Sequence, residues 1–94
     1  MDISELRKEI DDIDSQLVDL YCRRMDTARE IGRYKQENGL PVLDSERERN
    51  LLNKVAAQAG EENEQGIRAL YRLLLEQSRH RQLLDGHQEN GTGL

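Results

Sequence analysis

Three cationic side chains lie on or beside the apolar stripe of the segment over residues 3–37. With a rotation of about 100° per residue, an apolar stripe between about 220° and 280° is formed by Leu6, Ile10, Ile13, Leu17 and Ala28. Arg24 at about 240° and Lys35 at about 260° fall inside the stripe, and Arg7 lies on its edge. A cation that faces a core is costly unless an anion meets it. One such residue would indicate a buried ion pair or a side chain that reaches solvent, but two or three on one seam favour an anion-binding site.

The segment over residues 64–84 carries a similar signal on its own apolar stripe. Ile67, Tyr71 and Leu74 are spaced by four and three residues. Ser78 and Gln82 continue this series in steps of four. Residues at this spacing share one face of a helix, so a hydroxyl and an amide would face inward. The alternative is that this end of the helix is exposed and that both are ordinary surface residues.

The segment over residues 45–58 begins with polar residues beside its apolar positions. Asp44 or Ser45 can serve as the N-cap, and Ser45 and Glu48 have the spacing of a capping box. Glu48 is therefore open to two interpretations, because it either completes the capping box or faces a ligand. Arg47 is either a solvated surface charge or a member of the anion site.

The other reactive side chains form no recognisable motif. His80 and His87 have no partner at the spacing of metal ligands, and Cys22 lies on the polar side of its segment. The sequence contains no Gly-rich phosphate loop, no CxxC and no recognisable pairing of a nucleophile with a histidine. We therefore expect a site that holds an anion by hydrogen bonds, without evident covalent machinery.

These residues must be positioned by helices. Residues 3–37, 45–58 and 64–84 form one long and two shorter helical segments, and Asn38, Gly39 and Pro41 end the first. The long segment carries a heptad seam of Ile3, Leu6, Ile10, Ile13, Leu17 and Leu20. At 1.5 Å per residue it would be roughly 50 Å long, which exceeds the width of a compact chain of 94 residues. The shorter helices cannot cover it, so we predict an all-α fold of three helices per chain in a homodimer.

The composition agrees with one helical domain, which we place at residues 1–85, followed by a flexible tail at 86–94. Apolar and charged residues each make up 35% of the chain, so a small aliphatic core is expected. The net charge of −5 disfavours nucleic acid as the main partner. The sequence has no run of about 18 apolar residues, so no membrane span is predicted. The first residues also lack the apolar region of a secretory signal. A single cysteine fits the reducing cytoplasm, where we expect the protein to act.

In order and spacing, these residues resemble a known family, the all-helical, intertwined-dimer class of chorismate mutase. This class includes the N-terminal mutase domain of bifunctional mutase–prephenate dehydratases. The matching stretches are LRKEIDDID at 6–14, RRM at 23–25, IGRYK at 31–35, PVLDSERER at 41–49, and EQS at 76–78 with Gln82. Each stretch alone is a weak signal, but the set in order covers residues 4–84, nearly the whole chain.

The resemblance implies a Claisen rearrangement of chorismate to prephenate, on the route to Phe and Tyr. It also implies a dimer of three-helix chains with two active sites, each built from both subunits. Carried over position by position, Arg7 would reach into the site of the partner. The chain's own site would be lined by Arg24, Lys35, Asp44, Arg47, Glu48, Ser78 and Gln82.

The residue types suit this reaction. Chorismate carries two carboxylates, which forked arginine donors bind well, and the resemblance assigns them to Arg24 and to Arg7 of the other chain. The rearrangement needs no nucleophile, base, metal or cofactor. The protein must instead hold the reactive conformation and stabilise the negative charge that builds on the ether oxygen. Lys35 and Gln82 are assigned to that oxygen.

The ring hydroxyl is assigned to Glu48 and the region of Asp44, while Arg47 and Ser78 support the carboxylates. The position of this hydroxyl distinguishes chorismate from isochorismate, the substrate of an isochorismate–pyruvate lyase that shares the fold and the cationic residues. The resemblance favours the mutase, because the lyase lacks an acid at the position of Glu48. An alternative of another class is a non-catalytic helical dimerisation module, in which a change of Arg24 would have no effect on function.

Overall fold

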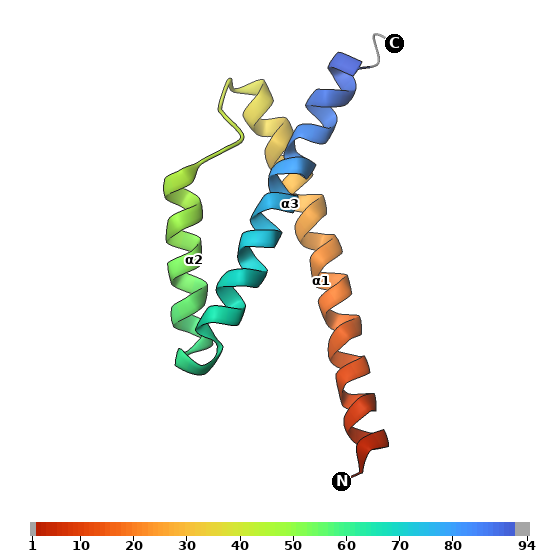
Figure 1. Cartoon of the computed structure of the whole chain (residues 1–94). Coiled ribbons are helices and arrows are strands. Elements are labelled where there is room, and N and C mark those ends of the chain that lie inside the picture. The colour runs from red at the N-terminus through yellow and green to blue at the C-terminus, as the bar shows by residue number, and fades with distance from the viewer. Residues whose placement is uncertain (1, 92–94) are drawn as a thin grey trace.

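The computed structural model describes residues 2–91, with side chains as far as Leu84, and this part of the chain is all-helical (Figure 1). The order of elements is α1 (Ile3–Glu37), α2 (Ser45–Ala59), the 3-10 turn η1 (Glu61–Asn63) and α3 (Glu64–Gly91). The predicted all-α fold, with one long and two shorter helices, is confirmed. Within residues 2–91, no helix combines the length and the apolar character that crossing a membrane requires.

Helix α3 is the central element of the fold (Figure 1). It packs against both α1 and α2, whereas α1 and α2 do not pack on each other within the described residues. A space is therefore left between α1 and α2 along one side of α3. The N-terminal half of α1 continues beyond the other two helices and gives the chain a longest extent of 57 Å. Helix α1 itself has 35 residues, which at 1.5 Å per residue gives a length of about 50 Å, as predicted.

A glycine allows the close crossing of α1 and α3. Gly32 is buried in α1, and a Cβ atom at this position would lie 2.6 Å from the Cα and 2.7 Å from the carbonyl carbon of Gln82. Carbon atoms in contact are normally about 3.5–4.0 Å apart, so any larger residue would push the helices apart. Gly32 therefore brings the backbone of α3 at Gln82 next to the last turns of α1, where Lys35 lies.

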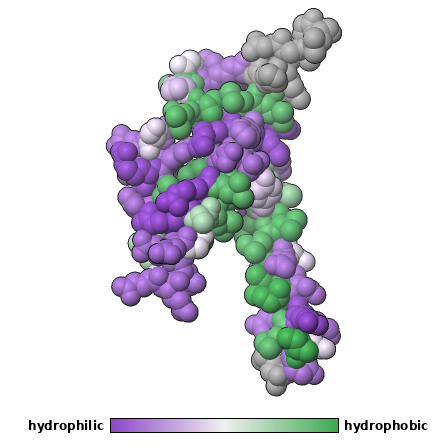
Figure 2. Space-filling view, viewed as in Figure 1, coloured by the Kyte–Doolittle hydropathy of each residue, from purple (hydrophilic) through white to green (hydrophobic). Residues whose placement is uncertain are grey.

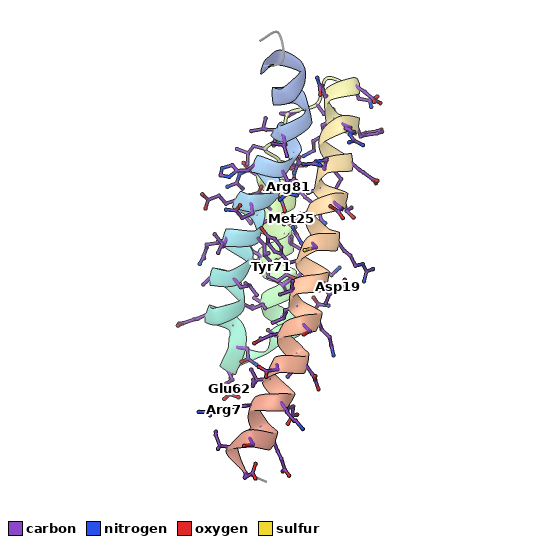
Figure 3. The ribbon with its side chains drawn as sticks, turned by 90° about the vertical axis from the view of Figure 1, so that its right-hand side faces the viewer. Arg7, Asp19, Met25, Glu62, Tyr71 and Arg81 are labelled. Carbon is purple, nitrogen blue, oxygen red and sulfur yellow. The ribbon has the colours of Figure 1, made fainter. Side chains whose placement is uncertain are left out.

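The apolar core of a single chain is small, as its aliphatic composition predicts. The buried apolar residues are Met25, Ala28, Val55, Ala56 and Leu75, which come from all three helices. Met25 points from α1 toward α3 (Figure 3) and keeps only 1% of its surface exposed. Because α1 and α2 each pack on α3, this core holds both helices against α3, on the two sides of the space between α1 and α2.

The heptad seam in the N-terminal half of α1 has no cover within the described part of the chain. Leu6, Ile10, Ile13 and Leu17 are 43%, 55%, 45% and 53% exposed. Figure 2 shows apolar surface along the projecting end of this helix. Such a regular apolar stripe is typical of a helix that packs on another surface, as the sequence predicted.

The start of α2 decides between the two expected N-caps. The side chain of Asp44 accepts a hydrogen bond from the backbone N–H of Arg47 at 3.0 Å, so Asp44 is the N-cap. Ser45 is the first helical residue, and a capping box between Ser45 and Glu48 is therefore not formed. The carboxylate of Glu48 is left for another role.

Helix α3 extends further than its apolar pattern predicted. The pattern ends near Leu84, whereas the helix continues to Gly91. Backbone hydrogen bonds can continue a helix after its packing partners end, so the end of an apolar stripe does not mark the end of the helix. The flexible tail expected at 86–94 overlaps this extension, and its last three residues lie outside the described part.

Candidate active site

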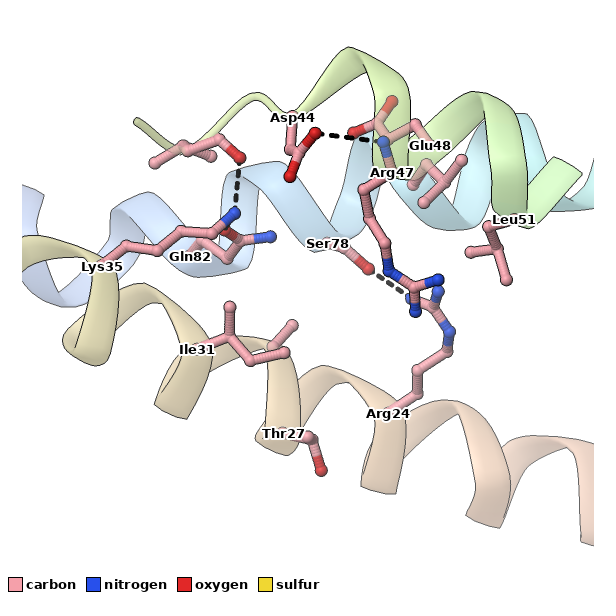
Figure 4. Close-up of a pocket in the computed structure, with 13 residues that line it drawn as sticks. Arg24, Thr27, Ile31, Lys35, Asp44, Arg47, Glu48, Leu51, Ser78 and Gln82 are labelled. Carbon is pink, nitrogen blue, oxygen red and sulfur yellow. Dashed lines mark hydrogen bonds between the residues drawn. The ribbon is translucent and has the colours of Figure 1, made fainter. Parts of the chain in front are cut away.

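A cavity of about 470 Å³ fills the space between α1 and α2, with α3 as its floor (Figure 4). This volume is within the range of small-molecule sites, which is about 300–1,000 Å³. Its polar lining includes seven of the eight residues that the sequence predicted, namely Arg24, Lys35, Asp44, Arg47, Glu48, Ser78 and Gln82. Three segments that are distant in sequence, from α1, the start of α2 and α3, thus meet at one place.

The remaining predicted residue, Arg7, lies near the N-terminus of α1 and does not line this cavity (Figure 3). Arg24 is 17 positions further along the chain, which corresponds to about 26 Å along a helix. An arginine side chain cannot span this distance. Arg7 can therefore act only at a site other than the cavity of its own chain.

The alternative that Ser78 and Gln82 are surface residues is wrong. Ser78 is only 6% exposed, and Gln82 is partly buried. Both point into the cavity from α3 (Figure 4). Their place on the stripe continued from Leu74 is the signal that located them.

Lys35 is held at one end of the cavity by two hydrogen bonds (Figure 4). Its Nζ donates to the backbone oxygen of Val42 at 2.7 Å and to Oε1 of Gln82 at 2.9 Å. An ammonium group has three donors, so one remains available. Because lysine can only donate, the Gln82 atom that faces it is the oxygen, which leaves the Gln82 amide N–H groups available as donors. The pair thus offers an ammonium donor and an amide donor side by side.

Arg24 is braced at the other end of the cavity. Its Nη1 donates to Oγ of Ser78 at 2.5 Å, and its guanidinium lies over the ring of Tyr71 at 5.8 Å from the centroid. The hydroxyl and the aromatic face fix the guanidinium plane, but neither neutralises its charge. The buried ion pair considered for Arg24 is therefore absent from the described residues, and the guanidinium keeps donors for an anion.

The guanidinium of Arg47 points from α2 toward α1 in the direction of Arg24 (Figure 4). Among the described residues, the backbone N–H of Arg47 donates to Asp44, whereas its guanidinium forms no hydrogen bond. Its side-chain charge has no carboxylate partner in this part of the chain. Arg47 therefore adds to the positive charge of the cavity.

Glu48 has a partner that sequence reasoning missed. Nη1 of Arg79 donates to both carboxylate oxygens of Glu48, at 2.6 and 2.7 Å. The residues are 31 positions apart on α2 and α3, so no local spacing signals the pair. The only feature of the sequence that associates Arg79 with the site is its position directly after Ser78.

The charges of the cavity do not balance within it. Arg24, Lys35 and Arg47 form no ion pair with a carboxylate among the described residues, while the charge of Glu48 is met by Arg79. Asp44 also lines the cavity, where its carboxylate accepts a hydrogen bond from the backbone N–H of Arg47, so the three cations outnumber the two carboxylates. Three cations that line one cavity repel one another, so an anionic ligand between them is strongly favoured. The arrangement can bind an anion through several directed hydrogen bonds.

The family described as chorismate mutase type II matches residues 6–83, and the chain belongs to that family. The resemblance noted in the sequence is thus confirmed. The chain is 29% identical over 80 residues to the chorismate mutase of Methanocaldococcus jannaschii, with 82% of this chain and 80% of the relative covered. No solved structure gives a significant match.

Two further relatives are much longer proteins. The chain is 41% identical over 54 residues to the bifunctional chorismate mutase/prephenate dehydratase of Aquifex aeolicus, which covers 57% of this chain and 15% of the relative. It is 36% identical over 50 residues to the T-protein of Haemophilus influenzae, with 53% of this chain and 13% of that protein covered. The chain spans less than a sixth of these two relatives.

Proposed function

We propose that the protein is a chorismate mutase that converts chorismate to prephenate as a cytoplasmic enzyme of aromatic amino acid biosynthesis. The observation that carries this proposal is the set of three cations in one cavity that have no carboxylate partner within the described part of the chain. Chorismate is a dianion of a size that such a cavity accommodates. Family membership and the name of the Methanocaldococcus jannaschii relative support the same activity.

The two carboxylates of chorismate account for the arginines. Arg24, braced by Ser78 and Tyr71, offers its remaining N–H donors to one carboxylate. Arg47 supports this binding from α2. A guanidinium forms paired hydrogen bonds to a carboxylate and stays charged at every working pH. Binding at both carboxylates holds the side chain over the ring, which is the conformation that reacts.

The ether oxygen accounts for Lys35 and Gln82. In the rearrangement one C–O bond breaks while one C–C bond forms within the same molecule, and no proton is transferred. Negative charge builds on the ether oxygen as its bond to carbon lengthens. The free ammonium donor of Lys35 and the amide donor of Gln82 are held in place before reaction, so they stabilise this charge without reorganisation.

The proposed assembly is an intertwined homodimer in which each site takes Arg7 from the partner chain. The exposed seam of Leu6, Ile10, Ile13 and Leu17 supports it, because a second copy would cover a stripe that the described chain leaves open. Arg7 lies on the edge of this seam and too far from its own cavity. In the dimer it would bring a further cation to the neighbouring site.

The test is an assay of purified protein on chorismate and, separately, on isochorismate. Loss of chorismate absorbance with prephenate as the identified product is the expected result. A matched Lys35→Met variant should be slower by about 100- to 1,000-fold, the effect of removing one donor to a developing oxyanion. Pyruvate from isochorismate alone would instead indicate the lyase. If neither compound is converted, the result would favour the alternative of a non-catalytic dimerisation module.

A further inference from the structure

An ion pair between α2 and α3 lies at the edge of the cavity, and only its acidic member is part of the lining. Glu48 lines the cavity, whereas Arg79 does not. The side chains of Arg79 and Glu48 are 31% and 21% exposed. Arg79 thus meets Glu48 from outside the space in which a ligand would lie.

The geometry of α3 explains this placement. Ser78 and Gln82 are four residues apart and share the face that points into the cavity. Arg79 is rotated by about 100° from Ser78 around the same helix, which carries its side chain toward α2. The same turn of α3 therefore presents Ser78 and Gln82 to the cavity and, through Arg79, holds Glu48 on α2.

The contact restrains the carboxylate of Glu48 in a particular way. A single nitrogen, Nη1 of Arg79, donates to both oxygens at 2.6 and 2.7 Å. An ionised carboxylate has about four lone-pair sites, so two remain for other donors. The Glu48 side chain is thus limited in rotation while its carboxylate can still accept a hydrogen bond from a ligand in the cavity.

We propose that Arg79 is a positioning residue, which orients Glu48 so that its free lone pairs accept a hydrogen bond from the ring hydroxyl of the substrate. This proposal rests on the proposed function, because the hydroxyl is that of chorismate. It makes Arg79 a determinant of substrate choice, since a fixed carboxylate recognises the position of a hydroxyl and not only its presence.

The experiment compares chorismate with an analogue that lacks the ring hydroxyl. Loss of a positive charge near a dianion raises KM for both compounds alike. The quantity compared is therefore kcat/KM for chorismate divided by kcat/KM for the analogue. Arg79→Gln should lower this ratio by about tenfold to 100-fold, the loss expected for one hydrogen bond to a charged group. The matched control is Arg72→Gln, which removes the same charge from an exposed position of α3 and should leave the ratio unchanged.

Two more variants separate positioning from a structural link. Arg79→Lys should retain a higher ratio than Arg79→Gln, because an ammonium group can also donate to both oxygens. If Arg79→Gln does not fold, Arg79→Lys is compared with the wild type, and its ratio should be lower because an ammonium group does not reproduce the planar guanidinium geometry. In a Glu48→Gln background, Arg79→Gln should change the ratio no further.

An unchanged ratio in Arg79→Gln, with a lower thermal midpoint, would show that the pair only ties α2 to α3 and would overturn the proposal. That result leaves the proposed function intact, provided that the wild-type protein converts chorismate. A wild-type protein that converts neither chorismate nor the analogue would overturn both.

Discussion

Replacement of Gly32 by alanine should reduce activity far more than stability. The added Cβ would lie 2.6 Å from the Cα of Gln82 and 2.7 Å from its carbonyl carbon. Because carbon atoms pack at about 3.5 Å or more, α1 and α3 must separate by about 1 Å at this point. The contacts are with backbone, which cannot turn aside as a flexible side chain would.

The separation acts directly on the donor pair of the site. Lys35 donates to Oε1 of Gln82 at 2.9 Å, and a shift of about 1 Å takes such a contact beyond hydrogen-bonding distance. A misplacement of this size costs about 100-fold in rate. Overpacking costs about 1–3 kcal/mol, but alanine is favoured over glycine within a helix by about 1 kcal/mol. The net loss of stability should therefore be about 2 kcal/mol or less.

The assay is the steady-state rate on chorismate together with the thermal midpoint of the same samples. Gly66→Ala is the matched control, because a Cβ at this position of α3 meets nothing within 4 Å. It should retain the wild-type rate and melt at the same or a slightly higher temperature. A Gly32→Ala protein with the wild-type rate would refute the argument that the close crossing positions Gln82 against Lys35.

Three further outcomes follow from the site and the exposed seam. Gln82→Glu should be much slower than wild type at about pH 8, and its rate should recover as the pH falls toward about 4–5. The reason is that a carboxyl group at this position can donate to the ether oxygen only when it is protonated. A flat pH–rate profile at the wild-type rate would contradict the role of Gln82. Arg24→Lys should raise KM by about tenfold or more, because lysine lacks the forked donors that serve Ser78 and a carboxylate together. Steady-state kinetics measure this, and an unchanged KM would contradict the role of Arg24. The thermal midpoint should fall on dilution if folding and dimerisation are coupled, whereas sedimentation that finds a stable, active monomer at micromolar concentration would argue against the dimer.

Much of the fold follows from local patterns in the sequence. Spacings of three and four residues place Arg24 and Lys35 on the inner face of α1, and the same rule places Ser78 and Gln82 on α3. The end of α1 and the start of α2 follow from turn and capping chemistry around Pro41. These features depend on residues a few positions apart, so a single sequence is sufficient to predict them.

The contacts between helices could not be predicted in the same way. The pair of Arg79 with Glu48 and the approach of Gly32 to Gln82 join residues distant in sequence. Helical periodicity gives the face on which a residue lies, but not the height at which two helices cross. The role of Gly32 as a point of close backbone contact and the partner of Glu48 therefore required the structure.

The proposed chorismate site is complete only with Arg7 from a second chain, and subunit mixing tests this proposal most directly. Arg7→Ala and Arg24→Ala should each be nearly inactive. When equal amounts exchange subunits, half of the dimers are mixed and one of their two sites has both arginines, so activity should return to about one quarter of the wild-type value. If activity does not return, although mass spectrometry shows that mixed dimers have formed, both arginines act within one chain and the shared site is contradicted.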